Sequence, residues 1–370
     1  MTVRLKTRAA RVRAEDKRVE LDSGEQLPFD HLVFATGAVP RSLEIPGEDL
    51  PGIFHLRNLT DALRIKNFLA ELKYKRALIV GAGFVSLEMC EAFRKLGLST
   101  TLVHRSELPM GRLDEEFGKK ILAELEKNEV QFISKTTVKS FEAKSGGGIL
   151  VETSNGPLET DLVLLGVGVV PEVSLAAEAG ITIGPTGAIA VDDHMRTNLD
   201  FIYSAGDCCE SYHRISGKPV HYPLGDIANK QGRVAGGNIG GQDHIFPGVV
   251  GSSCFKVFDL EVASTGLTER EAREAGFDAT SVTIQGVSKP HGYPGARKLW
   301  LEMVADKDSG RLLGAQGVGG DGVVFRINIL AAVLTADLSV QELAYLDLAY
   351  APPFSGSWDP IHIAAQQLLK

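Results

Sequence analysis

The chain has 370 residues, of which 44% are hydrophobic and 23% are charged, and this balance excludes a disordered protein. Its formal net charge of −8, without a long basic run, argues against nucleic acid or an anionic membrane as a partner. The sequence has neither an apolar stretch long enough to span a membrane nor a signal-peptide core, so we expect a cytoplasmic protein.

The N-terminal part reads as β-rich. Alternating apolar residues predict a strand over Val3–Val12, and a short apolar run predicts another over His31–Ala35. The second strand ends at Thr36-Gly37. The Pro- and Gly-rich stretch Val39–Gly52 then predicts a crossover into a second domain.

A strand–turn–helix–strand unit follows. After a helix predicted at about Asn58–Leu72, an apolar strand covers Ala77–Val80 and a turn covers Gly81–Gly83. A helix over Val85–Leu96 and a strand over Thr100–His104 complete the unit. Such alternation is typical of a parallel α/β sheet.

The turn of this unit predicts a dinucleotide-binding loop. Gly81 allows the tight turn, Gly83 lets a pyrophosphate approach the backbone, and the helix that starts there provides free N–H groups and a positive dipole end. Ser86 stands where a third glycine is usual, and it is small enough for close packing. The alternative is a plain tight turn. The loop residues that we expect to contact the cofactor are Gly81, Gly83, Phe84 and Val85.

The end of the second strand bears on the choice between NADPH and NADH. An acidic residue there would bind the ribose 2′-OH of NADH, but this chain has His104-Arg105-Ser106. Arg105 can pair with a 2′-phosphate, and His104 leaves no acid to repel it. We therefore expect NADPH in preference to NADH, with a solvated surface arginine as the alternative.

The remaining elements continue the α/β pattern and then change character. Phe201–Ala205 is an apolar strand ending in Gly206-Asp207, and from Pro247 the pattern becomes α+β. The other predicted elements are a helix over Asp114–Asn128, two hairpin-like segments, a strand over Leu162–Leu165, a helix over about Leu224–Ile239, strands over Ala279–Gln285 and Lys298–Val304, and a helix over Gly322–Leu334.

Two motifs outside the nucleotide unit carry a family resemblance. Ala35-Thr36-Gly37 and the stretch Thr197–Asp207, on either side of a complete dinucleotide domain, resemble the two-dinucleotide-binding flavoproteins. The resemblance implies that Asp207 binds the ribityl chain of FAD. It further implies FAD contacts at Thr36, Gly37, Gly206, Pro223 and Leu224, with the helix after Leu224 pointing its dipole at the flavin.

The C-terminal motifs narrow that resemblance. Asp347–Ser355 followed by Trp358-Asp359-Pro360 resembles the dimerisation domain of the coenzyme A-disulfide reductase, NADH oxidase and NADH peroxidase group. Tyr293–Ala296 and Leu313–Gln316 fit the same pattern. The resemblance implies a homodimer in which Tyr350 and Tyr293 reach the partner's redox centre, and it places Glu88 near the nicotinamide. Gly168, at the end of a buried strand, is also expected to border the nicotinamide. The alternatives are a surface charge near a helix N-terminus for Glu88 and a plain return crossover for Gly168. Packing in turns is the alternative for both tyrosines.

The resemblance implies an α/β fold: a two-dinucleotide-binding-domain flavoprotein fold with an incomplete first domain, plus a C-terminal α+β dimerisation domain. The expected segments are a partial FAD-binding domain (1–55), an NAD(P)-binding domain (56–171), the continued FAD-binding domain (172–246) and the dimerisation domain (247–370). Members of this group begin with a further FAD-binding βαβ unit and a redox cysteine. We find neither in the sequence, and we expect the chain to be N-terminally truncated.

The four cysteines and nine histidines show no metal-ligand spacing, so we expect no metal. A redox role for the adjacent pair Cys208-Cys209 is a minor alternative.

These observations predict a flavin-dependent oxidoreductase that passes hydride from NADPH or NADH through FAD to a small disulfide of the coenzyme A type. One alternative is an NADH oxidase or peroxidase of the same group, acting on an oxygen species. The other is a flavin-free, dimeric NAD(P)-binding remnant without catalysis.

Overall fold

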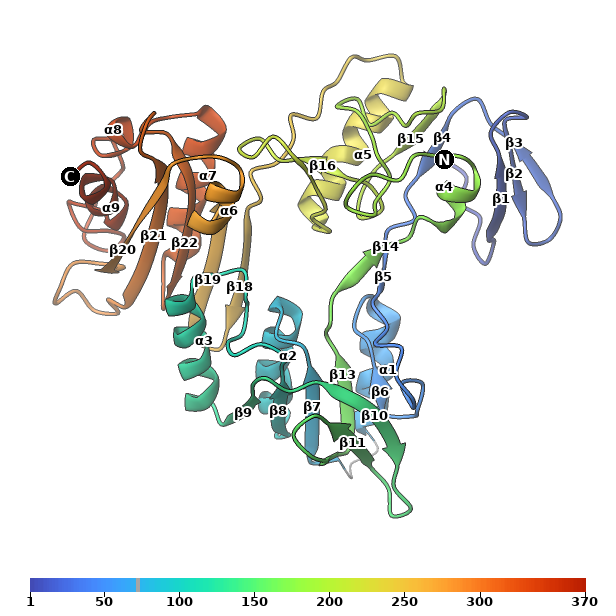
Figure 1. The fold of residues 1–370 in the computed structure, drawn as a ribbon, viewed down its shortest axis with the longest axis horizontal. Helices are drawn as coiled ribbons and strands as arrows, with labels where there is room; N and C mark the ends of the chain where they lie inside the picture. The colour runs from blue at the N-terminus through green and yellow to red at the C-terminus, as the bar shows by residue number, and fades with distance from the viewer. Residues whose placement is uncertain (71–73) are drawn as a thin grey trace. The chain divides into compact units, whose positions relative to one another are not determined.

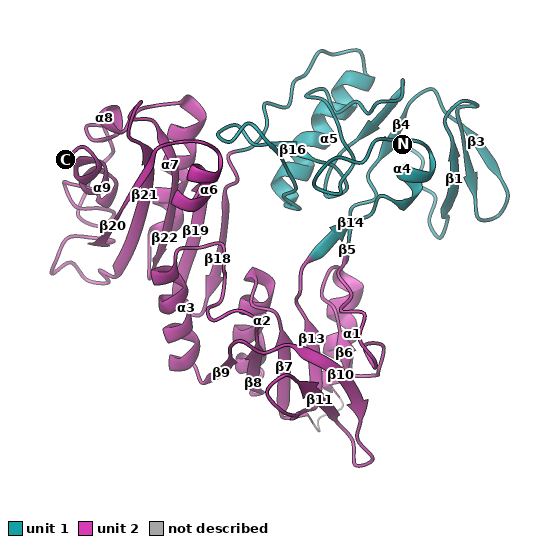
Figure 2. Cartoon of the chain, in the orientation of Figure 1, with its two compact units in different colours: residues 1–39, 169–249 teal, residues 40–168, 250–370 magenta. Residues whose placement is uncertain are grey.

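The computed structural model describes residues 1–70 and 74–370, which form two compact units (Figures 1 and 2). The first unit comprises Met1–Val39 and Val169–Val249, and the second comprises Pro40–Gly168 and Val250–Lys370. The predicted end of a helix at Leu72 lies outside the described residues. In the part of the chain that is described, no helix is both long and apolar enough to cross a bilayer.

The first unit is built around two parallel strands, β4 (Leu32–Phe34) and β15 (Ile202–Ser204). Successive side chains of a strand point to opposite faces, so Ile202 packs with α4 and the β1-β2-β3 meander while Tyr203 packs with α5. The other elements of this unit are β1 (Ala9–Arg13), β2 (Arg18–Leu21), β3 (Gln26–Pro28), β5 (Ala38–Pro40) paired with β14 (Val169–Pro171), α4 (Ser174–Glu178), β16 (Ser211–Tyr212), β17 (Pro219–Val220) and α5 (Gly225–Ile239).

The prediction of a strand over Val3–Val12 was wrong for its first half. The strand β1 begins at Ala9, where pairing with Leu21 of β2 starts. Val3 and Leu5 are 65% and 81% exposed. The alternating apolar residues of this segment therefore form no buried face that would stabilise a strand.

The second unit begins with a five-stranded parallel sheet in the order β6-β13-β7-β8-β9. The predicted strand–helix–strand unit is confirmed as β7, α2 and β8. The strand β9 was not predicted. The elements are β6 (Ile53–Phe54), α1 (Leu59–Ala70), β7 (Arg76–Val80), α2 (Phe84–Lys95), β8 (Ser99–Val103), α3 (Glu115–Lys127), β9 (Val130–Ile133), β13 (Leu162–Leu165) and a meander of β10 (Val138–Ala143), β11 (Ile149–Thr153) and β12 (Leu158–Thr160).

The C-terminal half of the second unit is an antiparallel sheet in the order β18-β19-β22-β21-β20. Helix α7 packs against β19 and β22, and helix α9 packs against β20 and β21. The bounds are β18 (Ser253–Val257), β19 (Leu260–Gly266), α6 (Glu269–Glu274), β20 (Ala279–Val287), β21 (Lys298–Asp306), β22 (Leu312–Gly319), α7 (Val323–Ala336), α8 (Val340–Leu343) and α9 (Pro360–Leu368).

The two halves of the second unit share one hydrophobic core. Helices α2 and α3 pack against β18, and α3 also contacts β22. Two carboxylates fix the contact: the half-buried Glu91 accepts from the backbone N of Phe258 at 3.0 Å, and the buried Glu124 accepts from that of Asp259 at 3.2 Å. The segments predicted as separate domains at 56–171 and 247–370 therefore pack together, while the three predicted boundaries between segments stay predictions.

Candidate functional site

The loop after β7 requires glycine at its first position. Gly81 has φ +95°, and its backbone N donates to the carbonyl of Val103 at 2.9 Å. A Cβ at this position would lie 2.5 Å from the carbonyl oxygen of Gly166. Only glycine fits both the backbone conformation and the space.

The second glycine of the loop faces open space. A Cβ on Gly83 would meet nothing within 4 Å, and Gly83 is the N-cap of α2 without a side-chain cap. The first backbone N–H groups of α2 are therefore open to an anion. Ser86, fully buried, donates to the carbonyl of Gly166 at 3.3 Å, which explains why a small residue stands at that position.

The remaining residues predicted on α2 lie at its exposed start. Phe84 is 42% exposed, and its ring lies 6.4 Å from that of Phe255. Val85 is half-buried and Glu88 is exposed. Partial desolvation of its carboxyl group by the surrounding protein, together with the charge of Glu91, raises the pKa of Glu88. This part of the helix provides a small apolar surface and one carboxylate beside the glycine loop.

The end of β8 continues the site along the carboxyl edge of the sheet. His104 is half-buried and Arg105 is exposed. Burial and the charge of Arg105 lower the pKa of His104, so the imidazole is neutral near pH 7. Arg105 makes no ion pair among the described residues. Its guanidinium is available to an anionic ligand.

The end of β13 completes this edge. The backbone N of Gly166 donates to the carbonyl of Val80 at 2.8 Å, and the exposed Gly168 has φ +99°. The structure therefore brings the glycine loop, His104-Arg105 and Gly168 to the carboxyl ends of three adjacent parallel strands. Ligands of open α/β sheets bind at such an edge.

The residues predicted to bind FAD lie in the first unit: Thr36, Gly37, Gly206 and Asp207 follow the carboxyl ends of β4 and β15, and Pro223 and Leu224 precede α5. Gly37 has φ +73°, and its carbonyl accepts from the backbone N of Glu172 at 2.9 Å. The hydroxyl of Thr36 donates to the carbonyl of Glu172 at 2.5 Å. Gly206, with φ +90°, is followed by the half-buried Asp207. The two Gly turns follow paired parallel strands and so lie at one edge.

Helix α5 is fixed to this edge. The buried Gln231 accepts from the backbone N of Gly206 at 2.9 Å and donates to Ser211 Oγ at 3.0 Å. The helix begins after Pro223 and Leu224, and the N-cap Leu224 provides no side-chain cap. As at α2, the first N–H groups of a long helix are left for another acceptor.

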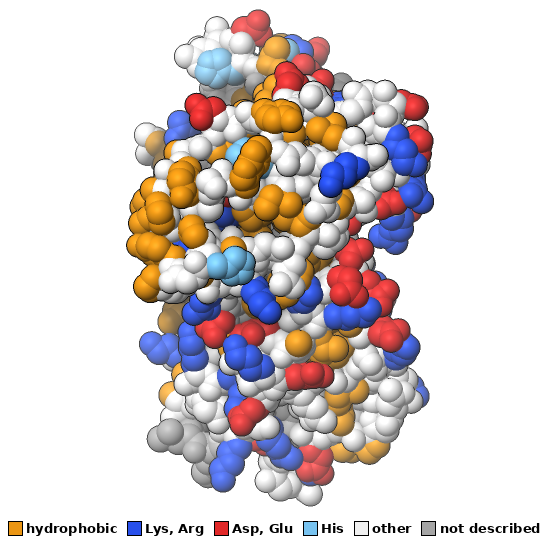
Figure 3. All heavy atoms as spheres, turned by 90° about the vertical axis from the view of Figure 1, so that its left-hand side faces the viewer, with side chains coloured by type: hydrophobic (Ala, Val, Ile, Leu, Met, Phe, Trp, Pro, Cys, Tyr) orange, Lys and Arg blue, Asp and Glu red, His pale blue; other side chains and the backbone are white. Residues whose placement is uncertain are grey.

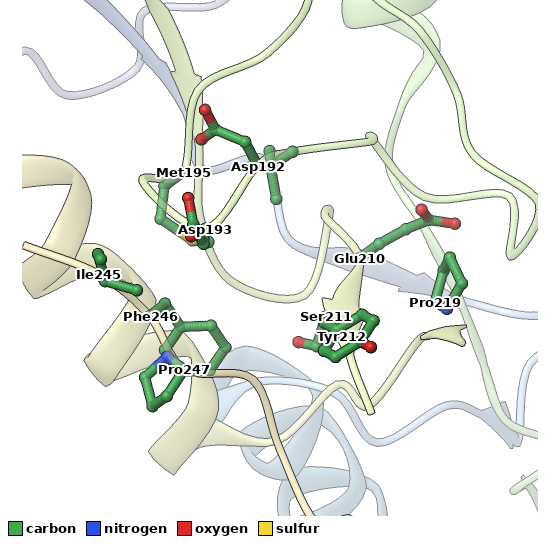
Figure 4. A pocket seen from close by; sticks show the side chains of 11 residues that line it. Asp192, Asp193, Met195, Glu210, Ser211, Tyr212, Pro219, Ile245, Phe246 and Pro247 are labelled. Carbon is green, nitrogen blue, oxygen red and sulfur yellow. The ribbon is translucent and has the colours of Figure 1, made fainter. Parts of the chain in front are cut away.

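A cavity of about 410 Å³ in the first unit was missed by sequence reasoning (Figure 4). It includes none of the predicted FAD residues. The acids around it are already engaged: Asp192 pairs with Arg196, Asp193 pairs with His194, and Glu210 accepts from Thr186. The lining residues are Val191, Asp192, Asp193, Met195, Glu210, Ser211, Tyr212, Pro219, Ile245, Phe246 and Pro247.

The two candidate tyrosines lie on the C-terminal half of the second unit. Tyr350 is 53% exposed and Tyr293 is 37% exposed. Figure 3 shows hydrophobic side chains gathered on one face of the molecule over this half. The exposed large apolar residues of this half are Tyr293, Phe325, Tyr345, Tyr350, Phe354, Trp358, Ile363 and Leu369. An apolar surface of this kind marks a binding interface.

The four cysteines differ in their exposure. Cys90, Cys208 and Cys209 are buried and form no disulfide with one another, and Cys254 is exposed. Burial raises the pKa of Cys90 to about 12 and also raises the pKa of Cys209. The proximity of Cys208 to Cys209 therefore does not make a reactive pair.

Comparisons with known proteins cover nearly the whole chain. A profile described as Pyridine nucleotide-disulphide oxidoreductase matches residues 1–232, and the dimerisation domain of the same description matches residues 252–360. The NAD(P)H sulfur oxidoreductase (CoA-dependent) of Pyrococcus furiosus is 40% identical over 349 residues, which is 94% of this chain and 78% of that protein.

Solved structures agree with this match. An NAD-dependent persulfide reductase from A. fulgidus superposes with a TM-score of 0.95 at 36% identity, over 98% of this chain and 68% of that one. An engineered water-forming NADPH oxidase bound to NADPH, a mutant of a Lactobacillus brevis enzyme, has a TM-score of 0.93 at 26% identity, over 99% and 82% of the two chains.

Proposed function

The chain belongs to the pyridine nucleotide-disulphide oxidoreductase family, and from this premise we propose that it passes hydride from NAD(P)H through FAD to a coenzyme A-type disulfide or persulfide. Each unit has a glycine turn and a long helix whose N-terminus has no side-chain cap. This observation carries the proposal. A turn and an uncapped helix start suit the phosphates and the electron-rich edge of a dinucleotide.

The nucleotide site in the second unit would bind NAD(P)H. The N–H groups after Gly83 would hold the pyrophosphate, with Phe84 and Val85 beside it. Glu88 and Gly168 would border the nicotinamide. All of these groups lie at the carboxyl edge of the parallel sheet. The nucleotide would therefore lie along this edge, with its ribose near His104-Arg105.

We infer NADPH in preference to NADH. Arg105 is an exposed cation without an ion-pair partner among the described residues, and the neutral His104 does not repel a phosphate. The engineered NADPH oxidase supports this inference, since its substitutions introduce arginine and serine at adjacent positions, and Arg105 is followed by Ser106 here. The NAD-dependent persulfide reductase shows that related proteins differ in this choice.

The residues of the first unit that we predict to bind FAD fit its flavin and ribityl end. Asp207 would accept hydrogen bonds from ribityl hydroxyls, and the start of α5 after Pro223 and Leu224 would stabilise negative charge on the flavin. The imidazole Nε2 of His221 donates to the carbonyl of Asp207 at 2.7 Å and would keep that turn in place. The chemistry that FAD supplies, when bound, is the transfer of two electrons from NAD(P)H to the disulfide acceptor.

We further propose a homodimer formed through the exposed apolar surface of the C-terminal half. Tyr350 and Tyr293 lie on that half, so dimerisation would allow them to contact the partner's acceptor site. The four cysteines are free thiols, as expected for a protein that works in the reducing cytoplasm.

The turnover experiment measures NADPH oxidation and thiol release together, with coenzyme A disulfide as acceptor in the absence of oxygen. The reaction NAD(P)H + H⁺ + RSSR → NAD(P)⁺ + 2 RSH predicts a pair of thiols for each NADPH oxidised. Oxidation only when oxygen is admitted would indicate the oxidase alternative. Nucleotide binding with no oxidation of NADPH by either acceptor would indicate the non-catalytic alternative.

A further inference from the structure

The loop after β9 is joined to the predicted ribose site by backbone hydrogen bonds. The backbone N of His104 donates to the carbonyl of Ile133 at 2.9 Å. In return, Thr136 N donates to the carbonyl of His104 at 2.9 Å, and Lys135 N donates to that of Ser106 at 3.2 Å. Residues 104–106 and 133–136 therefore form one continuous surface at the carboxyl edge of the sheet.

This loop is held rigidly on both sides of Lys135. Thr136 is 2% exposed, and its hydroxyl accepts from the side-chain amide of Asn155 at 2.6 Å. Lys135 itself has φ +50°, a left-handed conformation that is unfavourable for a non-glycine residue. A lysine held at a position that glycine or asparagine would occupy more easily is a candidate for a side-chain role.

The charges on this surface suit a phosphate. Lys135 lies 2.9 Å from Glu107, but their side chains are 66% and 72% exposed, so water screens the pair and leaves the ammonium free to exchange partners. Arg105 adds a second cation and Ser106 a hydroxyl. Two cations and a hydroxyl on one rigid loop pair match a phosphate monoester, which carries nearly two negative charges at neutral pH.

We propose that Lys135 is the second specificity-determining cation, which together with Arg105 binds the 2′-phosphate of NADPH, and that Glu107 weakens this contact by competing for the ammonium. The inference rests on the proposed nucleotide site and deepens it. A 2′-hydroxyl, as in NADH, gains nothing from the lysine, so the effect of Lys135 is confined to the phosphorylated nucleotide.

Equilibrium binding tests this without any requirement for flavin or turnover. The probes are 2′,5′-ADP and 5′-AMP, followed by NADPH and NADH, with the wild type, Lys135→Gln, Arg105→Gln and Glu107→Gln. Lys139→Gln, an exposed lysine on β10, is the matched control. Lys135→Gln should weaken 2′,5′-ADP and NADPH by about fivefold and leave 5′-AMP and NADH within about twofold. Glu107→Gln should tighten the phosphorylated ligands by about twofold.

The outcomes separate this inference from the proposed function. Equal effects of Lys135→Gln on both nucleotides, or none on either, would overturn the role of Lys135 while the nucleotide site stands. If the folded wild type binds none of the four probes, both the nucleotide site and the role of Lys135 are wrong. If Lys139→Gln loses as much affinity as Lys135→Gln, the effect comes from general surface charge, and the proposal is overturned.

Discussion

A Cβ on Gly81 would lie 2.5 Å from the carbonyl oxygen of Gly166, so the loop after β7 and the end of β13 touch through their backbones alone. Two residues further along, the same loop has open space on its outer side at Gly83. The first glycine is thus needed by the fold, whereas we propose that the second is needed by a ligand. This difference gives a paired test.

Gly81→Ala should destabilise the chain by about 1–3 kcal/mol, because alanine at a positive φ is strained and its methyl group meets backbone. Gly83→Val should leave the free energy of unfolding within about 1 kcal/mol and weaken NADPH binding by at least about tenfold, because its side chain occupies the space open to the pyrophosphate. Urea unfolding and nucleotide titration of both variants measure this. Unchanged NADPH affinity in Gly83→Val would show that the loop does not hold the nucleotide.

A buried ion pair supports the C-terminal half. Arg326 and Asp359 are 1% and 5% exposed, and the guanidinium Nη2 lies 2.8 Å from the carboxylate. Asp359 also caps α9 and accepts from Ser355 Oγ at 2.7 Å. Asp359→Ala should therefore cost about 3–5 kcal/mol, since it leaves a buried charge without its partner.

The exposed pair of Lys307 and Asp278 is the control for that substitution. Its side chains are 51% and 57% exposed, so Lys307→Gln should change the free energy of unfolding by less than about 1 kcal/mol. Equal small effects in the two variants, measured by urea unfolding, would mean that the buried pair contributes no more than a surface contact.

Glu302 makes stability depend on pH. It is 4% exposed, and Gln316 Nε2 donates to its carboxylate at 2.8 Å. The Oε1 atom of the same Gln316 accepts from the backbone N of Asp114 at 2.9 Å. Burial and the charges of Asp114 and Glu269 raise the pKa of Glu302 to about 7. A raised carboxyl pKa means that the folded state binds the proton more tightly than the unfolded state. The free energy of unfolding should therefore fall as pH rises from about 4.5 to about 7.

Glu302→Gln should remove this fall, because the amide does not ionise and still accepts the hydrogen bond from Gln316. Above pH 7 the variant should be more stable than the wild type by up to roughly 3 kcal/mol, and near pH 4.5 the difference should be small. Glu126→Gln, an exposed site on α3, should keep the wild-type profile. A constant difference between Glu302→Gln and the wild type over this pH range would refute the titration.

Thiol labelling tests the environment of the cysteines. With a disulfide reagent at pH 8, the native chain should show one fast thiol, at the exposed Cys254, whereas all four cysteines should react after unfolding. Cys254→Ser should remove the fast phase. A second fast thiol in the native chain, mapped by mass spectrometry to Cys208 or Cys209, would restore the redox role that burial argues against.

The nucleotide unit could be predicted from sequence because local patterns determine it. A continuous apolar run marks the strand that the structure gives as Arg76–Val80, and glycine spacing marks the turn. Helix and strand ends differ from prediction by one residue: Val85–Leu96 is observed as Phe84–Lys95, and Thr100–His104 as Ser99–Val103. Buried parallel strands and amphipathic helices leave such signals in any short window.

Other features depend on contacts between distant segments. The strand β22 is Gly-rich, and its role in the sheet follows from pairing with β19 and β21 rather than from its own residues. The contact of Gln316 with Asp114 joins residues that lie 202 positions apart. Lys135, which we propose as a site residue, was not predicted from sequence because its place beside Ser106 comes from the loop after the neighbouring strand. The roles of the predicted site residues stay predictions until binding is measured.

The most direct test of the account is the visible absorption spectrum of the purified chain, recorded before and after FAD is added and again after anaerobic addition of NADPH. The account predicts a protein-bound flavin spectrum that NADPH bleaches, with FAD affinity reduced in Asp207→Ala. A folded but colourless chain that FAD does not reconstitute would contradict the account, and the reductase activity could not then be assigned to this polypeptide.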